Sequence, residues 1–124
     1  MSTNLKKIAL GKNKINARTA RIRQLNDELR IRTRLPKRKD RRRWLVGSGA
    51  EKIGNIVAAA SAFDDWNEGD NPYGEHDFGK LDVDGEAVIF KIDYYSLDEL
   101  HGSEHPDDPG VTIRVLTLMF AEDY

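Results

Sequence analysis

The chain has 124 residues, no cysteine, 33% charged residues and a formal net charge of −1. It therefore holds no disulfide, thiolate metal site or cysteine nucleophile, and no apolar run approaches the roughly 20 residues that cross a bilayer. We expect one small cytoplasmic domain without a membrane partner.

The small net charge conceals two oppositely charged parts. Residues 1–43 hold 16 Lys and Arg against three acids, whereas residues 44–124 hold four against 18. Such a split indicates either a basic arm for an acidic partner or an arm that folds back on its own acidic body. The sequence leaves both alternatives open.

The first third of the chain is predicted to hold a lead-in and a helix. Residues 1–15 are polar and basic, which is typical of a flexible segment. A helix is predicted over 16–35, because Ile22, Leu25 and Leu29 recur at helical spacing. An asparagine can cap its first turn, and the proline that follows ends it.

A basic linker and the start of an acidic core come next. Residues 36–43 contain six cations and no large apolar residue, so we expect a solvated linker unless a polyanion or an acidic surface holds it. A short strand is predicted at about 43–47. A capping box of Ser48 and Glu51 then starts an amphipathic helix over 50–64.

The rest of the chain has the pattern of a hairpin followed by a buried strand. Asp84-Gly85 is a strong two-residue turn signal and joins predicted strands at 77–83 and 86–95. After a long loop, an almost wholly apolar run predicts a last strand over 111–121.

These elements predict an α+β fold. We expect a mainly antiparallel four-stranded sheet with two packed helices and a basic N-terminal arm, in which residues 16–124 form a single domain and residues 44–124 its acidic, sheet-containing core. The oligomeric state is left open.

Three groups of residues are candidates for chemistry. Glu75, His76 and Asp77 are the candidates for catalysis, because a carboxylate can orient a histidine that acts as a general base. The alternatives are a ligand site or the structural entry into the hairpin. His101 and His105 with nearby acids suggest a metal, but prolines and glycine argue against a helix there. We expect no metal and no cofactor.

Charged side chains on the last two strands form another candidate group. Lys91, Asp93 and Arg114 are expected to meet on adjacent strands, either as an ion-pair network or as a ligand site.

The basic third holds the candidates for binding a nucleic acid or another partner. Arginine suits phosphate and carboxylate alike, so the same residues fit a docked arm. The candidates are Arg30, Arg32, Arg34, Lys37, Arg38, Lys39, Arg41, Arg42 and Arg43.

Several segments resemble a known family. The chain is similar to the small bacterial proteins grouped as domain of unknown function 3768, over roughly residues 18–124. The resemblance is carried by Ile22–Asp27, Phe63-Asp64-Asp65, Asp70-Asn71-Pro72-Tyr73-Gly74-Glu75-His76-Asp77-Phe78-Gly79, Lys91–Tyr95, Gly102-Ser103, Asp107-Asp108-Pro109, Thr112–Thr117 and Ala121–Tyr124. It implies an origin on alphaproteobacterial chromosomes, plasmids or integrated elements, and it implies no particular activity. The Lys/Arg-rich lead-in and linker depart from the family pattern.

The sequence favours a non-enzymatic accessory protein of bacterial or mobile-element origin. In this hypothesis the basic N-terminal third binds a nucleic acid or a nucleoprotein complex. One alternative is an interaction protein whose acidic surface mimics nucleic acid, inhibits a defence enzyme or binds a basic partner. A second alternative is a small hydrolase or metal enzyme that uses His76. The acids of the first alternative are Asp64, Asp65, Glu68, Asp70, Asp107 and Asp108.

Overall fold

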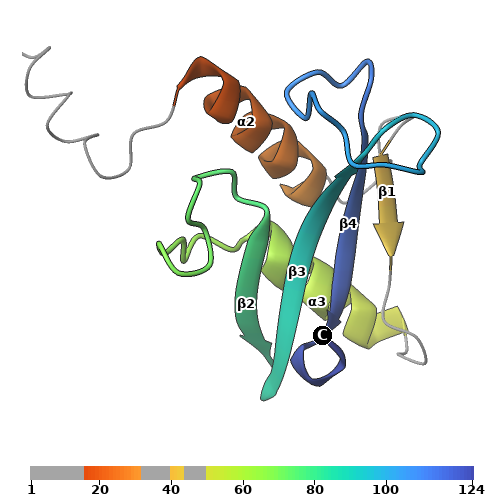
Figure 1. The fold of residues 1–124 in the computed structure, drawn as a ribbon. Coiled ribbons are helices and arrows are strands. Elements are labelled where there is room, and N and C mark those ends of the chain that lie inside the picture. Colours follow the sequence, from red (N-terminus) through yellow and green to blue (C-terminus); the bar gives the residue numbers. More distant parts are fainter. Residues whose placement is uncertain (1–15, 32–39, 44–49) are drawn as a thin grey trace, which may run out of the picture.

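The fold is known from a computed structural model, which describes residues 16–31, 40–43 and 50–124. In this part of the chain one sheet carries two helices on the same face (Figure 1). None of its helices has the length and apolar character to cross a lipid bilayer. In chain order the elements are α2 (Ala17–Ile31), β1 (Asp40–Arg43), α3 (Ala50–Ser61), β2 (Phe78–Val83), β3 (Glu86–Tyr95), β4 (Ile113–Phe120) and a 3₁₀ turn (Ala121–Asp123).

Helix α2 docks on the body of the domain through the predicted apolar stripe. Ile22, Leu25 and Leu29 are all buried, and Leu29 belongs to the same apolar cluster as α3 and the sheet. The predicted cap is confirmed, because the backbone N–H of Thr19 donates to Asn16 Oδ1 at 2.8 Å. The end predicted at residue 35 and the lead-in 1–15 lie outside the described residues.

Helix α3 packs on the rest of the core. Its Ile56 and Ala60 are buried against the sheet. The helix ends at Ser61, three residues before the predicted end, and the chain then turns so that the Phe63 ring packs edge-on against Trp66 and Phe90. Ser48 of the predicted capping box lies outside the described residues.

The predicted hairpin is confirmed. Strands β2 and β3 pair antiparallel, and the turn residues Asp84 and Gly85 both have positive φ, as a two-residue hairpin turn requires. Strand β3 then pairs antiparallel with β4 over eight positions, from Val88–Phe120 to Tyr95–Ile113.

The predicted sheet is correct in part. Its antiparallel portion has three strands, β2, β3 and β4, rather than four, and the strand order is β1-β4-β3-β2. The fourth strand, β1, pairs parallel to β4 and lies at 40–43, inside the predicted solvated linker. Pairing at a sheet edge uses backbone groups, so even a strand of charged residues can add there. Most of the strand predicted at 43–47 lies outside the described residues.

Gly79 on β2 lies directly against aromatic rings of the core. A Cβ atom built there would meet the Phe90 ring and would lie 2.9 Å from Phe63 Cε2. Phe90 has no exposed surface, so its ring has little room to move aside. Gly54 on α3 gives the opposite case, because a Cβ there meets nothing within 4 Å.

These two glycines give a matched prediction. We expect Gly79→Ala to lower the free energy of unfolding by about 1–3 kcal/mol through overpacking. We expect Gly54→Ala to raise it by about 0.5–1 kcal/mol, since alanine favours the helix. Urea unfolding of both variants measures the difference, and a neutral or stabilising Gly79→Ala would contradict the packing described.

Candidate functional site

Three side chains of helix α2 form hydrogen bonds with the loop before β2. Arg23 Nε donates to the carbonyl oxygen of Gly74 at 2.7 Å, and Asn26 Nδ2 donates to that of Glu75 at 3.0 Å. Asp27 Oδ1 accepts from His76 Nδ1 at 2.9 Å. Residues three and four apart lie on one side of a helix, so three consecutive loop residues meet one side of α2. We call this set of contacts the latch.

The side chain of Asn26 also connects the latch to the sheet. It is fully buried; Nδ2 donates to Tyr94 Oη at 2.8 Å, and Oδ1 accepts from Arg114 Nε at 2.8 Å. Tyr94 Oη donates in turn to Glu75 Oε1 at 2.8 Å, and Arg114 also donates to the carbonyl oxygen of Pro106. Burial raises the pKa of Tyr94 far above its ordinary value, so this hydroxyl stays protonated.

Asp27 and Trp66 hold the other half of the latch. Asp27 Oδ1 accepts from Arg30 Nη1 at 2.7 Å as well as from His76. The His76 ring stacks on Trp66 with centroids 3.8 Å apart and planes 5° apart, and the Arg30 guanidinium lies 4.8 Å from the Trp66 ring centroid. The carboxylate is therefore shared between a buried cation and the histidine.

The protonation state of His76 follows from its burial. Burial lowers its pKa from the ordinary 6.5, and this effect outweighs the hydrogen bond and charge of Asp27, which raise it. Near neutral pH the ring is thus uncharged and donates its Nδ1–H to Asp27. Among the described residues, Nε2 has no hydrogen-bond partner and no nucleophile is bonded to it.

The three catalytic candidates turn out to have different roles. His76 finds its carboxylate in Asp27, whereas Glu75 accepts from Tyr94. The pKa of Asp77 is raised, first by burial and then by the charge of Glu75. Sequence reasoning missed Asp27 because it lies 49 residues before His76, and neither residue's pattern indicates the pairing. A carboxylate-bound histidine is the orientation that a general base needs, but here the pair also closes the latch.

The nucleic-acid candidates are divided by the fold. Arg30 is buried, with Nε donating to the carbonyl oxygen of Ala60 at 3.0 Å, so it is not available on the surface. Arg30 follows Asn26 by four residues and therefore lies on the same, core-facing side of the helix. This position was the signal in the sequence for its burial. Arg41, Arg42 and Arg43 belong to β1. The candidates that lie outside the described residues are Arg32, Arg34, Lys37, Arg38 and Lys39.

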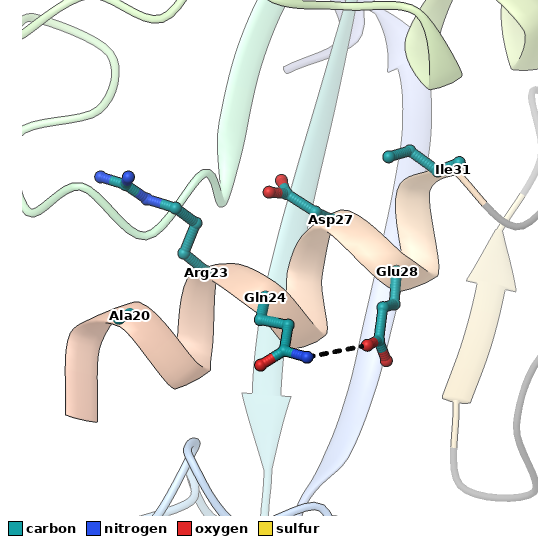
Figure 2. Close-up of a pocket in the computed structure, with 6 residues that line it drawn as sticks. All are labelled: Ala20, Arg23, Gln24, Asp27, Glu28 and Ile31. Atoms are coloured by element: carbon teal, nitrogen blue, oxygen red, sulfur yellow. Dashed lines mark hydrogen bonds between the residues drawn. The ribbon is translucent and has the colours of Figure 1, made fainter. Parts of the chain in front are cut away.

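The outer side of α2 borders a groove of about 590 Å³. Figure 2 shows Arg23 and Asp27 rising from one side of the helix, while Gln24 and Glu28 lie on another and bond to each other at 3.3 Å. The described lining residues all come from α2, and Asp27 brings the latch to the border of the groove.

The remaining charged candidates are also placed by the structure. Lys91 and Asp93 pair at 3.1 Å as expected. Arg114 is opposite Tyr94 in the register and bonds to Asn26 on the helix side, so the expected three-residue cluster does not form. No group of three or more His, Cys, Asp or Glu within the described ranges is placed to hold a metal ion.

Comparison with known proteins gives one result. Residues 38–123 match the model of a family described as "Protein of unknown function (DUF3768)". The matched range contains the whole sheet and α3, and α2 precedes it. Neither the curated proteins nor the solved structures that were compared give a match to this chain.

The pKa of His76 gives a pH prediction. Because the folded-state pKa lies below the unfolded 6.5, the unfolded chain binds a proton more readily, and stability is lost as the pH falls below about 6.5. His76→Asn removes the titration, while asparagine tolerates the positive φ of 59° and keeps an N–H for Asp27. We expect this variant to lose less free energy of unfolding between pH 7 and pH 5.5 than the native chain.

The control for this experiment is His101→Asn, which replaces a histidine that lies outside the latch and has a side chain that is 77% exposed. Urea unfolding at both pH values provides the measurement. An equal loss of stability in the native chain and in His76→Asn would contradict the assignment of an uncharged, latched histidine.

Proposed function

The chain belongs to the DUF3768 family, whose description names no activity, and from its charges and contacts we propose that it is a non-enzymatic accessory protein that binds nucleic acid or a nucleoprotein complex through the basic segment before residue 44. Its bacterial or mobile-element origin is inferred from the family resemblance, and we place its action in the cytoplasm. The observation that carries the proposal is the position of β1 as the outermost strand of the sheet.

Part of the basic third has a structural role within the domain. Arg30 is buried, Arg23 holds the loop through Gly74, and Arg18 pairs with Asp107 at 3.2 Å. The docked-arm alternative therefore describes α2. That alternative does not explain the three consecutive arginines of β1, because the strand contains no apolar residue that could anchor them. The arginine fork matches phosphate oxygens, so three arginines in the outermost strand of a sheet suit a polyanion.

A second candidate is the acidic interaction protein, and one observation favours it. The loop between β3 and β4 exposes Leu97 and Leu100, by 50% and 77%, next to Asp98 and Glu99. Exposed leucines among acids suit a basic protein partner with an apolar patch. This candidate gains support if the protein binds poly-lysine and fails to bind nucleic acid.

We expect the native chain to bind labelled DNA or RNA with steep salt dependence. The triple variant Arg41→Gln/Arg42→Gln/Arg43→Gln should reduce the slope of log K against log salt by roughly 2–3, at about 0.7–0.9 per lost phosphate contact. Fluorescence anisotropy between about 50 and 200 mM salt measures it. Glutamine keeps the backbone pairing with β4.

The matched control removes three charges elsewhere. Lys52→Gln/Lys80→Gln/Lys91→Gln carries the same change in net charge after residue 44, on α3, β2 and β3, and should keep the native salt slope. Equal losses in both variants would mean that net charge, not β1, drives binding. If the native chain fails to bind at low salt and the β1 variant self-associates, the arginines protect a sheet edge and the proposal is wrong.

A further inference from the structure

The loop between β3 and β4 gathers exposed apolar side chains. Six large apolar residues are exposed in the described part of the chain, and three of them, Leu97, Leu100 and Val111, lie within residues 96–112. In Figure 1 this loop extends past the end of β3, at the end of the sheet where β4 begins. We call residues 96–112 the tip loop. Apolar side chains that gather on a surface, rather than being scattered singly, mark an interaction site.

The three residues project from the same end of the sheet. Leu97 and Val111 each lie two residues beyond Tyr95–Ile113, which is the outermost pair of β3 and β4. Leu100 lies in the turn that follows Leu97 and is the most exposed of the three. A partner that approaches this end of the sheet therefore meets apolar side chains first.

Hydrogen bonds hold the turn that carries Leu100. The backbone N–H of Leu100 donates to Asp98 Oδ1 at 2.9 Å, and that of Ser96 donates to the carbonyl oxygen of His101 at 2.8 Å. Beyond His101, Gly102 forms a bridge with Tyr95 of β3. The turn has a fixed backbone before any partner arrives, so binding orders fewer groups and loses less entropy.

The charge around these apolar side chains has one sign. The tip loop holds five acids and neither lysine nor arginine. Asp107 pairs with Arg18 at 3.2 Å, whereas Glu104 and Asp108 are exposed residues. The hydrogen bond from the Ser96 hydroxyl is the main cause that lowers the pKa of Asp98, so this exposed carboxylate stays ionised near neutral pH. The apolar patch therefore has an acidic rim.

This rim selects among the possible occupants of the patch. Phosphates of a nucleic acid and the headgroups of an anionic membrane carry the same sign of charge as the loop and are repelled. A second copy that approached with its own tip loop would bring the same acids, which disfavours a symmetric contact. A basic protein surface is attracted, and the leucines favour one that also offers an apolar side chain.

We propose that the tip loop docks a basic segment of another protein, in which an apolar side chain is flanked by lysines or arginines. The apolar side chain packs on Leu97 and Leu100, and the flanking cations face Glu104 and Asp108. This inference goes beyond the proposed binding of nucleic acid, because it needs no nucleic acid, and it defines the surface that the acidic interaction candidate would use.

The test uses three labelled peptides of equal length in fluorescence anisotropy titrations. The first has lysines around two leucines, the second has the same lysines around two serines, and the third has glutamates around the two leucines. We expect the native chain to bind the lysine–leucine peptide most tightly. Leu100→Ser should weaken this binding roughly 5- to 30-fold and leave binding of the lysine–serine peptide unchanged.

Tyr73→Ser is the matched control for the apolar contact. This tyrosine is 76% exposed in the loop before β2, outside the tip loop, so its variant should bind all three peptides as the native chain does. Equal losses in Leu100→Ser and Tyr73→Ser, or equal binding of the two lysine peptides to the native chain, overturn the inference.

A second pair of variants tests the rim. Glu104→Gln/Asp108→Asn should weaken both lysine peptides by roughly 2- to 5-fold per charge, and asparagine keeps the oxygen that accepts from the Gly110 N–H. The control Asp64→Asn/Glu68→Gln carries the same change in net charge at exposed positions outside the tip loop and should bind as the native chain does. The same loss in both variants would mean that net charge alone drives binding, and it would overturn the inference.

Two further measurements separate this inference from its rivals. We expect Leu100→Ser to keep the native salt slope for nucleic acid, so the inference and the proposed function can fail independently. Size-exclusion chromatography of the native chain and Leu100→Ser should give the same elution volume. If the native chain self-associates and Leu100→Ser does not, the occupant is a second copy of this chain and the inference is wrong.

Discussion

The buried amide of Asn26 is the contact on which the arrangement of this domain depends. Its two N–H groups and its oxygen bond to the Glu75 carbonyl, Tyr94 Oη and Arg114 Nε, and so connect α2 to the loop, β3 and β4. All three partners lie at least 49 residues away in the sequence. A buried polar group that loses its partner costs about 1–3 kcal/mol. The Asn26 amide, the Glu75 carbonyl, the Tyr94 hydroxyl and the Arg114 guanidinium therefore depend on one another for their stability.

This contact decides how the charges of the chain are divided. Once Asn26 fixes α2, Arg23 and Arg30 face the loop and the core, and their charges serve the fold. The basic segment after α2 is different, because its described part is an outer strand that pairs with β4 through its backbone. Within the basic third, α2 is thus docked on the acidic body, whereas the arginine-rich β1 forms an edge of the sheet. The proposed function belongs to this edge.

Much of the fold is readable from local patterns. Strong periodicity located α2, α3 and β4, and the Asp84-Gly85 turn located the hairpin to within one residue. Strand β1 was missed because Asp-Arg-Arg-Arg has no apolar alternation, and only the free edge of β4 makes a strand of it. The Asp27–His76 contact was also missed, since a pair formed between a helix and a distant loop leaves no signal in spacing. The burial of Arg30 was not predicted, because its charge placed it among the binding candidates although its position on the helix faces the core.

A double-mutant cycle between Asn26 and Tyr94 tests the central role of this amide most directly. Asn26→Ala, Tyr94→Phe and the double variant are compared by urea unfolding, since Tyr94→Phe removes only the hydroxyl. The account predicts that the two changes are coupled by about 0.5–3 kcal/mol, as expected for residues in one hydrogen-bond network. Effects that add to within about 0.3 kcal/mol would contradict it.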